Sequence, residues 1–212
     1  MDLGKKGSIL KKGSSVNISK THAGLKKLRL ALMWEFKPGQ DADLDASALM
    51  LGSDGKTLGE GTMAWHKNLV HCRQAVVHQG DIRSADDLDE GENMGKETID
   101  IDLSLICEHV KEILAVITTY SEEEPVLFGR VKNAGVVLSK LKEGGATEAL
   151  YNCDLSEDIS NYTSMEVARF YRDEKGEWNF QPVGKGIGKS PLGFRDVLLK
   201  YNPYFKEEEE EG

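Results

Sequence analysis

The sequence predicts an all-β or β-rich fold, and two observations favour this over a helix bundle. Apolar and polar residues alternate over short stretches along most of the chain, which is the pattern of strands. Turn signals separate these stretches, and the 212 residues include 22 Gly and five Pro. A chain of this length can bury a substantial core, either as one large domain or as two small ones.

The first predicted strands follow a basic, Gly-rich N-terminal segment. A short strand is predicted over Ser15–Ser19 and a longer one over Lys27–Glu35, where Leu or Trp occupies every second position. Lys37–Gln40 contains a Pro-Gly pair and interrupts the alternation. Asp41–Leu51 is extended again, and both of its faces become apolar after Asp45, so we expect a buried strand with acidic residues at its entrance.

Three aspartates at alternate positions of this acidic strand need an explanation. Asp41, Asp43 and Asp45 share one face of an extended chain, where they repel one another and are costly to bury unpaired. A divalent cation would remove both problems, and Ca²⁺ accepts about 6–8 oxygen ligands in irregular geometry. The alternative is a solvated strand end. An EF-hand starting at Asp41 does not fit, because Ala46 and Gly52 occupy the positions that require Gly and Glu.

The alternation continues towards the C-terminus. Further strands are predicted over Thr62–His66, Gln74–Gln79, Thr98–Leu103, Glu112–Tyr120, Val131–Leu141, Thr147–Asp154, Glu166–Arg172 and Glu177–Val183. Pro191 suits the first turn of a final helix. The partly apolar face of that helix consists of Leu192, Phe194, Val197, Leu198 and Tyr201. Lys206–Gly212 reads as a solvated acidic tail, which we expect to be disordered.

Gly80–Glu97 is a long polar stretch between two predicted strands. It contains two bases, Arg83 and Lys96. Its acids are Asp81, Asp86, Asp87, Asp89, Glu90, Glu92 and Glu97. Loops this long without regular structure are usually functional or disordered. If the fold brings this stretch to the acidic strand, two bases are too few to balance the charge, and a bridging cation would order the loop. The alternative is a flexible charged loop that binds no ion.

Charge and cysteine content limit the partners and the compartment. The net charge of −9 and the pI near 5.1 disfavour nucleic acid and anionic membranes as partners and favour cations. We find no signal peptide and no apolar run long enough to span a membrane. Cys72, Cys107 and Cys153 are odd in number and form no CxxC pair, which suits a reducing cytoplasm. We expect them to be ordinary buried strand residues.

No motif in the chain argues for an enzyme. Gly184–Ser190 (GKGIGKS) resembles a phosphate-binding loop, but Val183 stands where that motif needs its first Gly. A glycine connector before the final helix is the better interpretation. The five histidines contain neither HxH nor HExxH, and no nucleophile elbow is present.

Five blocks occur in order along the chain. They are GSILKKGSSVNISK (Gly7–Lys20), DADLDASALML (Asp41–Leu51), VVHQGD (Val76–Asp81) with its acidic loop and IDIDLS (Ile99–Ser104), CDLSEDIS (Cys153–Ser160), and a late W-x-F strand with a glycine-rich segment. Over most of its length the chain thereby resembles the TerD family of tellurite-resistance and stress-response proteins. This resemblance implies a β-sandwich of two packed sheets with short peripheral helices, and Ca²⁺ bound at one end.

The resemblance also implies which residues bind the ion. Ca²⁺ would lie between the DLDAS carboxylates and the acidic loop that follows Gly80. The ligands implied in this way are Asp41, Asp43, Asp45, Asp81, Asp86, Asp87, Asp89, Glu90 and Glu97. Ile82 stands where the family commonly has Asn, and the loop is longer than usual. Which loop acid compensates, and whether one or two ions bind, therefore stays open.

We expect one TerD-like domain at 1–205 and a disordered tail at 206–212. The expected function is that of a cytoplasmic Ca²⁺-ordered interaction module in resistance to tellurite and general chemical stress. Other proteins of a stress-response complex are its expected partners, and no enzymatic activity is expected. Two alternatives stay open, a metal-dependent hydrolase that uses the same carboxylates and a metal-free acidic interaction module.

Overall fold

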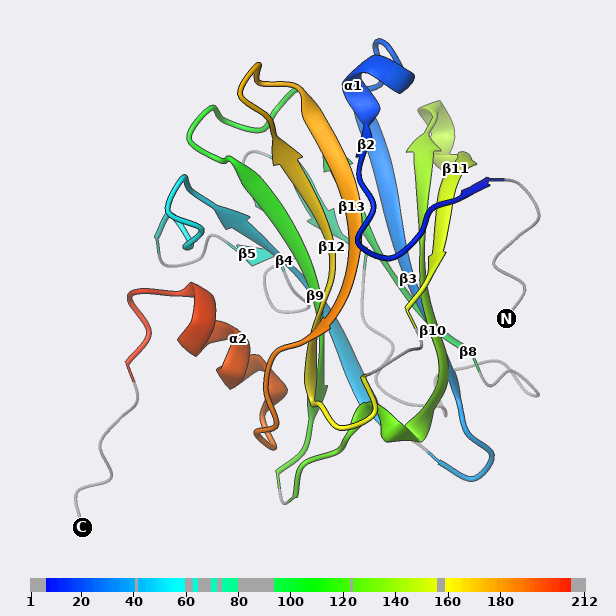
Figure 1. Cartoon of the computed structure of the whole chain (residues 1–212), viewed down its shortest axis with the longest axis vertical. Helices are drawn as coiled ribbons and strands as arrows, with labels where there is room; N and C mark the ends of the chain where they lie inside the picture. The colour runs from blue at the N-terminus through cyan, green and yellow to red at the C-terminus, as the bar shows by residue number, and fades with distance from the viewer. Residues whose placement is uncertain are drawn as a thin grey trace.

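Two β-sheets pack face to face in the computed structural model, with a short helix at the outside of the second sheet (Figure 1). The structure describes residues 7–40, 42–59, 63–64, 70–71, 74–79, 94–122, 124–155 and 159–206. This arrangement confirms the predicted all-β sandwich with short peripheral helices. No helix in the described part of the chain is long and apolar enough to cross a membrane.

The first sheet is mainly antiparallel and is built around β3. In spatial order its strands are β1 (Ser8–Ile9), β11 (Thr147–Asp154), β10 (Val131–Leu141), β3 (Lys27–Phe36), β8 (Met94–Asp102), β7 (Val76–His78) and β6 (Val70–His71). Only the short edge pair β1 and β11 runs parallel among these strands.

The second sheet carries the acidic strand. Its order is β2 (Val16–Asn17), β13 (Trp178–Gly186), β12 (Ser164–Arg172), β9 (Glu112–Tyr120), β4 (Asp43–Leu51) and β5 (Met63–Ala64). The helices are α1 (Ile18–Thr21), α2 (Gly193–Tyr201) and the 3₁₀ turns Phe128–Arg130 and Glu143–Gly145. Because β4 pairs with β5 only at Ala48 and Leu49, the acidic start of β4 is bordered by β9 alone among the named strands.

The core lies between the two sheets and follows the period-two alternation of the strands. On β4, Leu44, Ala46 and Met50 point into it, each with at most 1% of its surface exposed. Trp34 and Phe170 are among the largest fully buried side chains and fill the space between the sheets. The intervening residues of β4 therefore face away from the other sheet.

Helix α2 covers part of this outer face of the second sheet (Figure 1). Val197 and Tyr201 of the helix pack on Leu49 and Leu51 of β4 in a second, smaller apolar cluster. The helix can approach closely because it begins with Gly193, where an added Cβ would lie 2.3 Å from the Thr163 carbonyl oxygen. The expected final helix is thus confirmed, but it begins at Gly193, so the prediction that Pro191 belongs to its first turn is wrong.

The segment before α2 is a structural connector. Gly184 and Gly186 belong to the end of β13, and the Ser190 N–H and hydroxyl donate to the Asp196 carboxylate at 2.8 and 2.5 Å. An added Cβ at Gly188 would lie 2.1 Å from that carboxylate carbon. The glycines therefore allow a close turn into the helix, as the connector interpretation predicts.

Several strand boundaries differ from the prediction by a few residues, and two differences change the type of element. Ser15–Ser19 is not one strand, because the chain turns into helix α1 after Asn17, whose side-chain oxygen accepts the Lys20 N–H at 2.9 Å as an N-cap. The unstructured stretch predicted up to Glu97 is also too long. Strand β8 begins at Met94, because residues 94–97 pair with β3 of the first sheet.

Candidate functional site

Asp43 and Asp45 begin β4 on its outer face, as the alternation predicts. Both side chains are half-buried. Their cross-strand neighbours on β9 are Tyr120 for Asp43 and Thr118 for Asp45. Directly opposite residues of an antiparallel pair share a face, so two carboxylates and two hydroxyls lie together at this end of the second sheet.

The electrostatics of this end are negative. The Tyr120 hydroxyl donates to Glu122 Oε1 at 3.1 Å. This hydrogen bond and the Glu122 charge raise the pKa of the Tyr120 hydroxyl, and the charge of Asp43 adds to the effect. The prediction from sequence did not include Glu122, although it begins the acidic run that ends the β9 segment. The Glu122 carboxylate would therefore add to the negative potential at a cation bound by Asp43.

Glu97 lies where the two sheets approach each other. Its side chain is 2% exposed, and Oε2 accepts the Ala46 N–H of β4 at 2.7 Å. The same oxygen is 3.2 Å from Nε2 of His78 on β7, which is also buried. Glu97 thus connects the first sheet to the backbone next to Asp45, a structural role that the sequence did not indicate. Its role as a metal ligand stays a prediction.

The acidic segment 80–93 joins two strands that end at the same edge. Strand β7 ends at His78, and the Gln79 N–H donates to the Thr98 carbonyl of β8 at 2.9 Å. Because β7 and β8 are antiparallel, the chain leaves the sheet and returns to it at the edge where Glu97 contacts β4. The described residues that flank the segment, Gln79 directly after β7 and Met94 at the start of β8, therefore lie at neighbouring strands of the first sheet.

Six of the nine predicted ligands lie outside the described residues. They are Asp41, Asp81, Asp86, Asp87, Asp89 and Glu90. The described candidates are Asp43, Asp45 and Glu97, and no group of three or more His, Cys, Asp or Glu residues that could hold a metal ion occurs within the described ranges. A complete metal site therefore requires the other acids.

The donor chemistry of this end fits a hard cation. Asp43, Asp45 and Glu122 supply carboxylate oxygens, the ligand type that Ca²⁺ prefers. Of the two described cysteines, only Cys153 is buried. Cys153 is buried, which raises the pKa of its thiol to about 11, while Cys107 is exposed in the turn after β8. Cys153 therefore stays protonated and is an ordinary core residue, as expected. The same expectation is wrong for Cys107, which lies in an exposed turn and not in a buried strand, and Cys72 lies outside the described residues.

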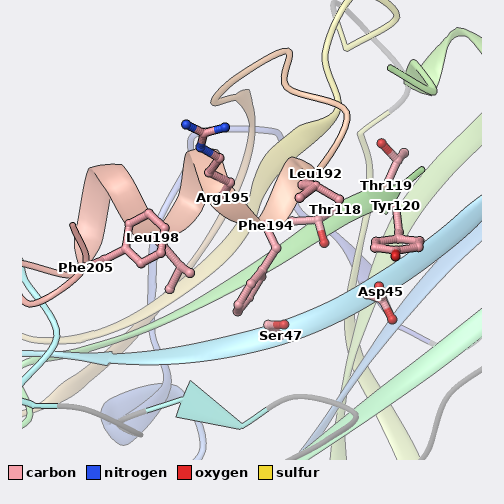
Figure 2. Close-up of a pocket in the computed structure, with 10 residues that line it drawn as sticks. All are labelled: Asp45, Ser47, Thr118, Thr119, Tyr120, Leu192, Phe194, Arg195, Leu198 and Phe205. Carbon is pink, nitrogen blue, oxygen red and sulfur yellow. The ribbon is translucent and has the colours of Figure 1, made fainter. Parts of the chain in front are cut away.

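A pocket of about 290 Å³ adjoins Asp45 (Figure 2). Its lining comes from β4, β9, the start of α2 and the chain that follows the helix. The lining residues are Asp45, Ser47, Thr118, Thr119, Tyr120, Leu192, Phe194, Arg195, Leu198 and Phe205. The strands supply the hydroxyl and carboxylate groups, and the helical segment supplies most of the apolar surface.

A buried charge network fixes the helix that forms one wall of this pocket. Glu166 of β12 is 1% exposed and accepts hydrogen bonds from Lys200 Nζ at 2.6 Å, from the Tyr201 hydroxyl and from Arg169 at 2.7 Å. Burial alone would raise the pKa of Glu166, but these hydrogen bonds and the Arg169 charge lower it to about 2. Glu166 is therefore ionised and ties α2 to the second sheet.

Comparison with known sequences gives the family of this sandwich. The TerD domain model matches residues 7–194. The chain belongs to the TerD family. It is 34% identical to tellurium resistance protein TerD of Serratia marcescens over 196 residues, which cover 91% of this chain and 95% of that protein. It is also 32% identical to general stress protein 16U of Bacillus subtilis over 181 residues, or 84% of this chain and 89% of that protein.

Solved structures agree on the fold of this TerD domain. The crystal structure of a homologue of telluride resistance protein (TerD) from Streptomyces coelicolor superposes with a TM-score of 0.62. That comparison covers 84% of this chain and 97% of the other, at 20% sequence identity. The predicted family and fold are therefore confirmed, and the names of the relatives connect the family with tellurium resistance and stress response.

Proposed function

We propose that this TerD-family protein binds Ca²⁺ between the Asp41–Asp45 strand and the Asp81–Glu97 segment. We further propose that it acts in the cytoplasm, in resistance to tellurite and other chemical stress, as an interaction module for other proteins. The names of its relatives, which refer to tellurium resistance and to general stress, support the second part. Neither part requires an enzymatic step.

The hydrogen bond from the Ala46 N–H to Glu97 is the observation that carries the calcium proposal. It joins the acidic strand to the strand that ends the acidic segment, at an Ala46 N–Glu97 Oε2 distance of 2.7 Å. We expect this contact to bring acids of the two segments to one edge, where they would repel one another at neutral pH. A divalent cation between them would offset this repulsion and fix the geometry of the segment as a surface for partners.

Bound Ca²⁺ would neutralise the acidic charge, and the protein residues would supply the ligands and hold the two sheets in position. Asp43 and Asp45 would hold the ion from the second sheet, and acids of the Asp81–Glu97 segment from the first. Glu97 positions the two sheets through Ala46 and His78. In this proposal the ion fixes the shape of the surface that binds partners. Loss of the acids on either side of the ion would therefore weaken partner binding without removing any catalytic step.

Isothermal titration with CaCl₂ tests the proposal. The unmodified protein should give saturable heat of binding, and Asp45→Asn should weaken the affinity about tenfold or more because it removes one charged oxygen ligand. Asp54→Asn, in an exposed turn, is the matched control and should bind like the unmodified protein. Equal affinity of all three proteins would refute the assignment of Asp45.

Two further experiments separate the alternatives. A metal-dependent hydrolase would cleave a phosphate ester in the presence of the metal and lose that activity in Asp45→Asn. A metal-free acidic module would bind its partner with strong salt dependence and no response to a chelator. The calcium-ordered module should hydrolyse no ester and should lose its partner on chelation.

A further inference from the structure

The pocket beside Asp45 contains a buried polar group that the proposed function does not use. Ser47 of β4 is 1% exposed, and its hydroxyl has no hydrogen-bond partner among the residues that the structure describes. Leaving such a group unsatisfied costs about 1–3 kcal/mol. The hydroxyl lines the pocket at the level of the sheet, below Phe194 (Figure 2). A ligand in the pocket would satisfy it.

Five lining residues of the strands carry a side-chain oxygen, and three of them, Asp45, Ser47 and Thr118, are neighbours on the outer face of the sheet. Asp45 and Ser47 are two residues apart on the same face of β4, and Thr118 lies opposite Asp45 on β9. Thr118 is also 1% exposed. A carboxylate and two hydroxyls can together accept three hydrogen bonds, which is the number that a primary ammonium group donates.

The other side of the pocket is apolar. Leu192, Phe194, Leu198 and Phe205 come from α2 and the residues on either side of it. Phe194 reaches from the start of the helix towards the strand that carries Ser47 (Figure 2). Ligand sites combine an apolar lining with a few well-placed polar groups, and a volume of about 290 Å³ suits a molecule of fragment size.

We propose that this pocket binds a small primary amine with an aromatic or branched apolar body. The ammonium group would donate to Asp45, Ser47 and Thr118, and the apolar body would lie against Phe194 and Leu198. Arg195 lines the helix side of the pocket, but the carboxylates of Asp45 and of nearby Asp43 and Glu122 outnumber it, and their charge on the strand side favours a cationic head there. The proposal goes beyond calcium binding and does not depend on it.

Titration with 2-phenylethylammonium in the presence of a chelator, followed by backbone NMR, tests the proposal. Saturable shifts should concentrate at β4, β9 and α2, with a Kd in the millimolar range or below. Ser47→Ala should weaken binding about tenfold, since it removes an acceptor for a charged donor. Ser139→Ala replaces a buried serine of β10 in the other sheet and should leave the affinity unchanged.

Two analogues test the chemistry of the ligand. Methylammonium lacks the apolar body and 2-phenylethanol lacks the charge, so both should bind at least tenfold more weakly. An affinity of Ser47→Ala equal to that of the unmodified protein, or an absence of saturable shifts, would overturn the proposal. Binding of either analogue with the same affinity as 2-phenylethylammonium would also overturn it. Thermal unfolding of Ser47→Ala serves to establish that it folds.

Repeating the titration with saturating CaCl₂ distinguishes this proposal from the calcium proposal. Because both would use Asp45, Ca²⁺ should weaken amine binding if both are correct. Amine binding that Ca²⁺ does not alter would support the pocket and count against Asp45 as a calcium ligand. Calcium binding without any amine binding would overturn the amine proposal and leave the calcium proposal standing.

Discussion

Saturating Ca²⁺ is expected to raise the melting temperature of this protein by about 5–10 °C relative to a chelator. An ion that binds only the folded state at a hundredfold excess over its Kd stabilises that state by about 2.7 kcal/mol. In a domain of this size, each kcal/mol shifts the midpoint by about 2–4 °C. Differential scanning calorimetry with CaCl₂ and with EGTA measures the shift directly.

The variant Asp43→Asn/Asp45→Asn is the critical comparison. It removes the charge of both described candidate ligands, so its midpoint should be the same with Ca²⁺ and with EGTA. It should also be at least as stable as the unmodified protein in EGTA, because the repulsion between the two carboxylates is gone. Glu174→Gln, in the exposed turn between β12 and β13, should retain the full shift. A double variant that retains the shift would contradict the account.

Removal of the Glu166 side chain is expected to have the largest effect on stability of any single substitution considered. Glu166→Ala leaves Lys200 and Arg169 without the carboxylate that they share at 2.6 and 2.7 Å. Removing one partner of a fully buried ion pair costs about 3–5 kcal/mol. The side chains of Lys200 and Arg169 are 38% and 30% exposed, and Arg169 keeps its pair with Glu112, so we expect a smaller loss of about 2–3 kcal/mol. Urea unfolding should show this loss, and it should be accompanied by detachment of α2, seen as selective loss of amide protection in that helix.

A control for Glu166 is available on β11 of the other sheet. Glu148→Ala removes the exposed carboxylate that pairs with Lys142 at 2.8 Å, and should leave the urea midpoint nearly unchanged because solvent screens an exposed pair. If Glu166→Ala unfolds at nearly the same urea concentration as the control, the network does not anchor the helix.

The hydrogen bonds and ion pairs of Glu166 also make the stability of the protein depend on pH, and stability should fall as the pH falls. Glu166 has a pKa of about 2 in the folded protein, below its ordinary value of 4.5. Its contribution to stability is therefore fully present above about pH 4.5 and is lost as the pH falls towards 2. The difference in stability between the unmodified protein and Glu166→Gln should shrink over this window. A constant difference between pH 6 and 2.5 would contradict the assignment.

Local pattern predicts most strands of this fold. Alternating residues predict β3, a continuous apolar run predicts β9, and the alternation at the start of β4 correctly places Asp43 and Asp45 on one face. The start of β8 was missed because residues 94–97 do not alternate clearly. Their strand conformation comes from pairing with Glu35–Leu32 of β3, a long-range contact.

The buried charges could not be predicted from the sequence. Glu97 lies 19 residues from His78 and 51 from Ala46, and Glu166 lies 34 residues from Lys200. Only the fold brings such partners together, and an acidic residue in a polar stretch is normally assigned to solvent. The pocket was missed for the same reason, since its walls combine two strands with the C-terminal helix.

A crystal structure determined in millimolar CaCl₂ tests the central claim most directly. The account predicts Ca²⁺ density at the edge of the sandwich, coordinated by Asp43 or Asp45 together with acids of the Asp81–Glu97 segment, at about 2.3–2.6 Å. Density for that segment away from Asp43 and Asp45, with only water beside their carboxylates, would contradict it.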